Sequence, residues 1–283
     1  MDRTFSDSFY WVKSENRAKL LVLSDLHFNK NLELGILFRT LIEIESNFCD
    51  YILIAGDLID DNNYLEDERN YEVLKWFLGE ISRRTPVIMV LGECDTRWLD
   101  GKNTYKAEPK ALIRMVSELK NVHLLRDEFY EDEKIRIFGA CQDSGCLDVD
   151  FLDSLFEDDT LFLVVSSLEV TEMEKSIVIY DSSTSEKDTE KTNILLLHSD
   201  EPIRDKKIKK ELGERFDLVI SGHKHNLALP DWLFNLGQKL FSSNLVHNGN
   251  LWSIVCRPLT VFPKNPLLQK LYHRGYSIVM LSR

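Results

Sequence analysis

Side chains that can bind metal ions recur along this chain, most of them directly after a short apolar segment. Asp and His make up most of the set, and one tetrapeptide contributes a Glu, a Cys and a further Asp. In chain order the set is Asp25, His27, Asp57, Glu93, Cys94, Asp95, His198, His223 and His225. Mixed carboxylate and imidazole ligands suit manganese, iron or zinc, and one shared carboxylate can bridge two ions. The pattern therefore predicts a site for divalent metal ions.

Nine short apolar segments, five of which precede these donors, are typical of buried strands. They cover residues 20–23, 51–55, 87–91, 135–138, 161–165, 177–180, 194–197, 218–220 and 276–281. Short runs of Leu, Ile and Val without polar alternation indicate strands that are covered on both faces. In open α/β sheets the carboxyl ends of the strands form the ligand crevice. We therefore expect the donors that follow five of these strands to meet at one edge.

Helical spacing separates the early strands. Residues 71–81 and 112–119 repeat apolar side chains at intervals of three and four, which predicts two amphipathic helices. The β-α-β-α-β order favours a parallel or mixed sheet with helices outside, and the strands after Glu128 indicate a second sheet. The polar tract 181–193 is expected to be an exposed loop or flexible insertion. We predict a single domain over 1–283, because the donors spread from position 25 to 225 must converge.

Taken singly, each element has a structural explanation, such as a helix-capping aspartate. Taken in order, they are distinctive: D-x-H at 25–27, GD at 56–57, GECD at 92–95, H at 198 and GHKH at 222–225. This order resembles the calcineurin-like metallophosphoesterases, and the resemblance runs from about Leu20 to Leu281. It implies a four-layer αββα sandwich of two mixed β-sheets flanked by helices, with a binuclear metal centre at the strand ends.

The resemblance also implies a role for each matching position. Asp25, His27 and His225 would hold the first ion. Asp57 would bridge both ions. The second ion would be held by Glu93, His198 and His223. In the family a hydroxide that bridges the two ions attacks phosphorus in line. The implied cofactors are two divalent ions, Mn, Fe or Zn.

One motif departs from the family, which has Gly-Asn-His and then an acid where this chain has GECD. Glu93 either still binds the second ion or turns outward. Cys94 occupies the position of the catalytic His, and Asp95 retains the acid. A thiol is a poor general acid, and loss of the general acid typically lowers the rate ~10²–10⁴-fold. A thiol beside a metal ion can instead lose its proton and bind the ion. Arg97 is either a phosphate clamp or part of a surface salt bridge.

We therefore expect a metal-dependent phosphoesterase that acts on a small phosphodiester or phosphoanhydride. Good leaving groups need less help from a general acid, which fits Cys94. The alternative is a catalytically impaired pseudoenzyme that keeps the fold as a metal-binding interaction scaffold. A third possibility, a nuclease, is disfavoured because the formal net charge of -12 opposes binding to nucleic acid.

The remaining sequence features concern compartment and partners. The N-terminal segment lacks the apolar core of a signal peptide, and no stretch approaches the ~18 apolar residues of a membrane span. Five scattered cysteines suggest free thiols in a reducing cytosol. The expected location is the cytoplasm and the expected partner is a small phosphorylated substrate, without membrane or nucleic acid. The oligomeric state is not indicated.

Overall fold

The computed structural model describes residues 8–14, 16–29, 34–100, 103–140, 190–199, 206–223, 245–249, 251–256, 258–259 and 275–282. Two predicted strands, 161–165 and 177–180, lie outside these ranges, as do His225 and residues 181–189 of the polar tract. Within these ranges, no helix combines the length and apolar character needed to cross a lipid bilayer.

The first sheet has six strands among the described residues, four of them parallel. In spatial order they are β1 (Ser8–Lys13), β14 (Ser277–Ser282), β2 (Ala18–Leu23), β3 (Tyr51–Ala55), β4 (Val87–Val90) and β7 (Val122–Leu124). Strands β2, β3, β4 and β7 run parallel, while β14 pairs antiparallel with β2 and parallel with β1. The sheet is therefore mixed, with its parallel part formed by the strands that precede the first donors.

The second sheet also has six described strands. In spatial order they are β12 (Leu245–Asn248), β13 (Leu251–Val255), β11 (Leu218–Ser221), β10 (Thr192–Leu196), β9 (Ile135–Gly139) and β8 (Glu128–Glu131). The four inner strands run parallel, and the two edge strands pair antiparallel with their neighbours. This sheet is mixed as well, and its parallel strands β10 and β11 precede the later donors.

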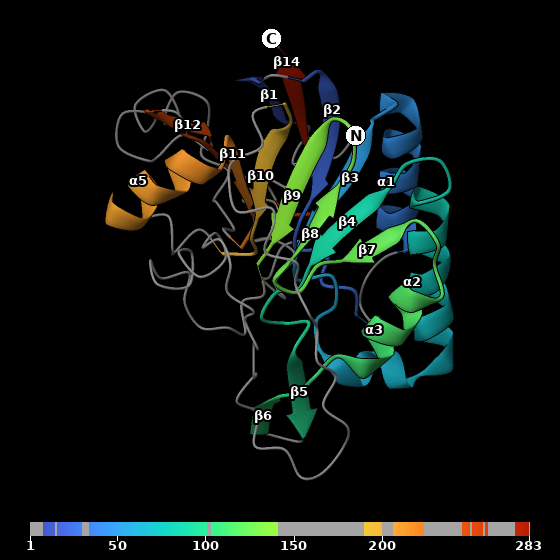
Figure 1. The fold of residues 1–283 in the computed structure, drawn as a ribbon. Coiled ribbons are helices and arrows are strands. Elements are labelled where there is room, and N and C mark those ends of the chain that lie inside the picture. The colour runs from blue at the N-terminus through green and yellow to red at the C-terminus, as the bar shows by residue number, and fades with distance from the viewer. Residues whose placement is uncertain are drawn as a thin grey trace, which may run out of the picture.

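Helices cover the outer faces of the two sheets (Figure 1). Three helices lie against the first sheet: α1 (Leu34–Asn47), α2 (Glu68–Ile81) and α3 (Lys110–Ser117). Helix α5 (Lys206–Arg215) lies against the second sheet. A short 3-10 helix η1 (Asn62–Glu66) and a hairpin of β5 (Arg97–Asp100) with β6 (Asn103–Lys106) follow the site loops. Helix α2 begins where the Asp67 side chain accepts a hydrogen bond from the backbone N–H of Asn70, as an N-cap does.

The buried side chains form three apolar clusters, one at each contact between layers. Along β2, Leu21 and Leu23 face the helices α1–α3, whereas Leu20 and Val22 face the second sheet. This follows from the two-residue period of a strand, and it explains why these segments lack polar alternation. The third cluster packs the outer face of the second sheet against α5 through Leu212. The predicted four-layer αββα sandwich is confirmed.

Local deviations from the sequence prediction have physical causes. The predicted loop 181–193 extends too far, because Thr192 and Asn193 are buried residues of β10. Asn193 tolerates burial because its backbone N–H donates to the Asp217 carboxylate at 2.9 Å, a tertiary contact that composition does not reveal. Helix α5 was not predicted, because its sequence KKIKKELGER is mostly charged and offers few apolar residues to set a period.

Candidate metal centre

The candidate metal ligands lie in loops that follow parallel strands. Asp25 and His27 follow β2, Asp57 follows β3, His198 follows β10 and His223 follows β11. The loops are tied together by backbone hydrogen bonds: the N–H of Asp25 donates to the Gly56 carbonyl at 3.1 Å and that of His27 to the Asp57 carbonyl at 3.0 Å. His198 and His223 come from the second sheet and join them: the backbone N–H of His223 donates to Asp25 Oδ2 at 3.1 Å, and His198 Nε2 lies 3.3 Å from Asp57 Oδ2.

The backbone is strained at these positions. Asp25, His27, Asp57 and His223 have positive φ angles of 53°, 47°, 52° and 67°. They are four of the six non-glycine residues with positive φ in the described part of the chain. A left-handed conformation costs roughly 1–3 kcal/mol for such residues and tends to cluster at functional sites. The cost falls on the candidate ligands themselves, as is common in loops that carry a functional site.

One group of donors contains Asp57, His198 and His223, whose ligand atoms all lie within 4.8 Å of one another. His198 Nε2 lies 3.3 Å from Asp57 Oδ2 and 3.2 Å from His223 Nδ1. Ligands that are about 2.1 Å from a tetrahedral zinc ion stand about 3.4 Å apart. On the other side of its ring, His198 Nδ1 is 2.8 Å from the Ala55 carbonyl; because a carbonyl only accepts, Nδ1 keeps its proton and Nε2 is the nitrogen left for a metal ion. The donor set fits a divalent ion.

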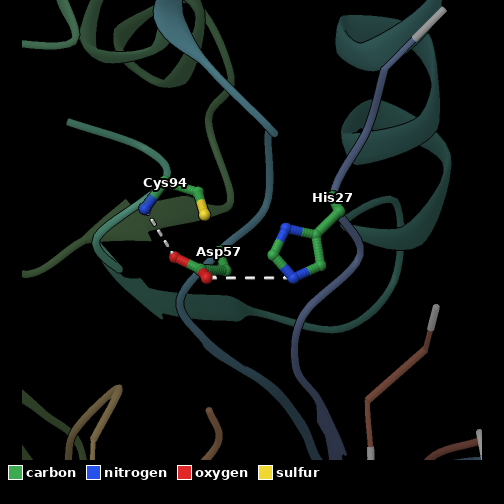
Figure 2. A group of neighbouring side chains, drawn as sticks. All are labelled: His27, Asp57 and Cys94. Carbon is green, nitrogen blue, oxygen red and sulfur yellow. Dashed lines mark hydrogen bonds and ion pairs between the residues drawn. The ribbon is translucent and has the colours of Figure 1, made fainter. Parts of the chain in front are cut away.

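A second group contains His27, Asp57 and Cys94, again with ligand atoms within 4.8 Å (Figure 2). His27 Nε2 lies 3.8 Å from Asp57 Oδ2 and 3.8 Å from Asp25 Oδ1. Asp57 therefore belongs to both groups, and its Oδ2 atom faces the histidines of both. One carboxylate facing two donor groups is the arrangement that a bridging ligand requires.

Two glycines allow the loops to approach Asp57 closely. A Cβ on Gly92 would lie 2.1 Å from Asp57 Oδ1, so no other residue fits there without a shift. Gly56 has φ +77°, and a Cβ at this position would lie 2.7 Å from His198 Nδ1. The GD and GECD motifs thus need their glycines for space and, at Gly56, for backbone conformation.

Two of the predicted site residues belong to neither donor group among the described residues. Glu93 is exposed and belongs to neither donor group among the described residues. Arg97 binds Asp60: its Nε donates to the Asp60 carbonyl at 3.2 Å, and its Nη2 lies 3.2 Å from Asp60 Oδ1. Asp60 Oδ1 is in turn 3.7 Å from His27 Nδ1. Of the two roles considered for Arg97, the structure contains the ion pair.

Asp60 is a candidate site residue that sequence reasoning missed. It stands three residues after Asp57 in the same loop, a position where an acid is easily taken for a turn residue. Its Oδ1 lies 3.7 Å from Nδ1 on the far side of the His27 ring, which is too far for a hydrogen bond but places a carboxylate where an outer interaction orients a ligand histidine. The only signal in the sequence was the acidic spacing in GDLID.

Comparison with known proteins identifies the family. The family model for calcineurin-like phosphoesterases matches residues 18–227 of the 283. The chain belongs to this family. Membership supports metal-dependent phosphoesterase activity, and the two donor groups supply candidate ligands for the divalent ions that such enzymes bind. A search of curated proteins finds no match.

Several solved structures resemble this phosphoesterase at low identity. A dimetal phosphatase from Danio rerio is 10% identical with a TM-score of 0.48, and the match covers 88% of this chain and 90% of that one. A purple acid phosphatase from yellow lupin seeds is 13% identical with a TM-score of 0.49, covering 94% and 50%. A phosphopantetheinyl hydrolase from Mycobacterium tuberculosis is 12% identical with a TM-score of 0.41, covering 86% and 89%.

Without an ion, electrostatics at the centre of this phosphoesterase depend on one buried pair. Burial alone would raise the pKa of Asp57, but the hydrogen bond and charge of His198 outweigh it and hold that pKa well below its usual range. Burial opposes the charged form of His198 too, yet Asp57 raises the pKa of His198 to about 9. A proton on His198 therefore neutralises Asp57 at the place where a cation would act when bound.

Asp95 has a structural position in this phosphoesterase. It is fully buried, and its two carboxylate oxygens accept hydrogen bonds from the backbone N–H groups of Ile59 at 2.9 Å and Gly92 at 2.8 Å. Burial and the nearby charge of Asp57 raise the pKa of Asp95 to about 7. These bonds join the Asp57 loop to the GECD turn. The catalytic role suggested by the motif stays a prediction, and the geometry supports a role in holding the two loops together.

We expect Asp95→Ala to lower the free energy of unfolding by about 1–3 kcal/mol. Each backbone N–H left unpaired by this change costs about that much, while removal of a buried charge close to Asp57 offsets a part. Thermal or denaturant unfolding of the chelator-treated protein measures the effect. Asp100→Ala, at an exposed carboxylate of β5, is the matched control and should change little. Equal stability of the two variants would contradict the structural role.

Proposed function

We propose that this phosphoesterase hydrolyses a small phosphodiester or phosphoanhydride at a centre of two divalent ions that share Asp57. The observation that carries the proposal is the position of Asp57 Oδ2, which faces the histidines of both donor groups at 3.3 and 3.8 Å. Asp25 and His27 are the proposed ligands of one ion, and His198 and His223 those of the other. His225, the remaining proposed ligand, lies outside the described residues.

When bound, two such ions supply Lewis acidity and lower the pKa of a coordinated water, which suits in-line attack on phosphorus. The side chains around them keep the site rigid. The backbone N–H of His223 donates to Asp25 Oδ2 at 3.1 Å, and the Ala55 carbonyl orients His198. Bound cations also invert the local sign of charge, so the net charge of -12 is compatible with an anionic substrate.

The proposed substrate class follows from the absence of a general acid at position 94. Burial and the charge of Asp57 raise the pKa of the Cys94 thiol far above its ordinary value, so the thiol does not donate protons as an imidazolium would. Substrates whose leaving group departs as a stable anion need no such donor. This consideration favours phosphoanhydrides and activated diesters over simple phosphomonoesters.

The proposed location is the cytoplasm, among small phosphorylated metabolites. It is supported by the three cysteines in the described part of the chain, Cys49, Cys94 and Cys256, which all carry free thiols. Free thiols persist in reducing compartments, whereas oxidising ones favour disulfides.

Elemental analysis of protein purified without chelators, combined with turnover assays, tests the function. We expect about two metal equivalents per chain and faster hydrolysis of a chromogenic phosphodiester, whose leaving group departs as a stable anion, than of an alkyl phosphomonoester. Chelation should abolish turnover, and added Mn²⁺ or Zn²⁺ should restore it. Two bound ions without any turnover would favour the alternative, a metal-binding scaffold without activity. Absence of bound metal would contradict the proposed centre altogether.

A further inference from the structure

Cys94 lies in a buried position from which its sulfur faces the donor groups. The side chain is 7% exposed, and Figure 2 shows its sulfur turned toward the space beside Asp57 and His27. The Sγ atom lies within 4.8 Å of a ligand atom of each of these two residues. Zinc binds thiolate sulfur at about 2.3 Å and imidazole nitrogen at about 2.1 Å, so donors within this span reach one ion with small side-chain adjustments.

The turn that carries Cys94 is held in place from several sides. The backbone N–H of Cys94 donates to Asp57 Oδ1 at 2.8 Å, which sets residue 94 beside the shared carboxylate. The Cys94 carbonyl accepts a hydrogen bond from Arg97 N at 3.1 Å, and Asp95 anchors the same turn through Gly92. The neighbouring Glu93 is exposed. The sulfur is thus preorganised toward the metal centre. In the same turn, the family resemblance implies Glu93 as the ligand.

We propose that Cys94 binds one of the two metal ions as a thiolate, together with His27 and Asp57; this inference rests on the metal centre proposed above. Binding forms a metal–sulfur bond and releases the thiol proton to solvent, with no change in oxidation state. A cation stabilises the thiolate that burial and Asp57 disfavour in the metal-free protein. Because thiolate is a soft ligand, this ion position prefers zinc over manganese, whereas carboxylate and imidazole donors alone discriminate less.

Cobalt(II) titration of the chelator-stripped full-length protein tests the inference without an activity assay. Wild type should bind two equivalents and develop a near-ultraviolet sulfur-to-cobalt charge-transfer band. Cys94→Ser should lose this band while the d–d absorption of bound cobalt persists. Cys49→Ser and Cys256→Ser change the two other cysteines of the described region and should keep the band. In competition with manganese, Cys94→Ser should retain zinc at least about tenfold less well than wild type.

The outcomes separate this inference from the proposed function. Two bound cobalt ions without a charge-transfer band in wild type would overturn Cys94 ligation and leave the binuclear centre standing. A band that survives in folded Cys94→Ser would overturn it equally. No cobalt binding by wild type would contradict both. If Cys94→Ser fails to fold, X-ray absorption at the cobalt edge decides the question: a sulfur neighbour in wild type and in both control variants supports ligation, and its absence overturns it.

Discussion

Asp57→Asn is expected to remove at least one metal equivalent and nearly all phosphoesterase activity. Asp57 is the only carboxylate shared by the two donor groups in the described part of the chain, and an amide cannot bridge two cations as a carboxylate can. Changes to residues that merely orient ligands already lower metal affinity about 10–100-fold. Loss of the shared ligand should therefore lower metal affinity by more than about 100-fold. Elemental analysis and chromogenic turnover measure the two effects.

The same substitution should lower the melting temperature of the metal-loaded protein, because bound ions stabilise the folded state by mass action. Most of the difference from wild type should vanish after chelation. Asp61→Asn is the matched control: it lies four residues along the same loop, and its side chain makes no capping hydrogen bond to η1. If Asp57→Asn leaves both metal content and melting temperature unchanged, the site is wrongly assigned.

Glu93→Asn combined with Cys94→His should raise turnover most for substrates with poor leaving groups. The double change restores the family pattern: it replaces the thiolate ligand proposed above by an imidazole, which in its protonated form could protonate the departing oxygen. The expected gain reaches up to the ~10²–10⁴-fold that is typical of general acid catalysis, and it should be smallest for good leaving groups. Rates across a series of aryl phosphodiesters with graded leaving-group pKa values measure this dependence.

The single changes make this prediction sharper. Glu93→Asn alone should do little, because Glu93 is exposed and lies outside both donor groups. Cys94→His alone should carry most of the gain, although effects within one site need not add. A uniform gain across all leaving groups would indicate that metal affinity was the deficiency. No gain at all, with both metals bound, would favour the scaffold alternative.

The buried strands could be predicted because each is short, apolar and covered on both faces. Tyr51–Ala55 coincides with β3, and β4, β9 and β11 differ from the predicted ranges by one residue. Edge and charged elements could not be predicted this way. Strand β1 exposes Phe9 and Trp11 while burying Val12, and helix α5 buries little besides Leu212. Such elements are stabilised by their neighbours, and their own composition carries a weak signal.

The sequence by itself determined which donors would meet, because the carboxyl ends of parallel strands share one edge of a sheet. That rule groups Asp25, His27 and Asp57 at the edge of the first sheet, and His198 and His223 at the edge of the second. The packing of the two sheets against each other brings the two groups together. Only the tertiary structure decided how the loops orient their side chains.

At the GECD turn, neighbouring side chains point in different directions, so residue order cannot tell which of them enters the site. The hydrogen bond from Cys94 N to Asp57 Oδ1 sets the buried Cys94 beside the shared carboxylate, while Glu93 is exposed. The contact between Asp60 and His27 likewise depends on the folded loop, since nothing in their spacing in the sequence requires it.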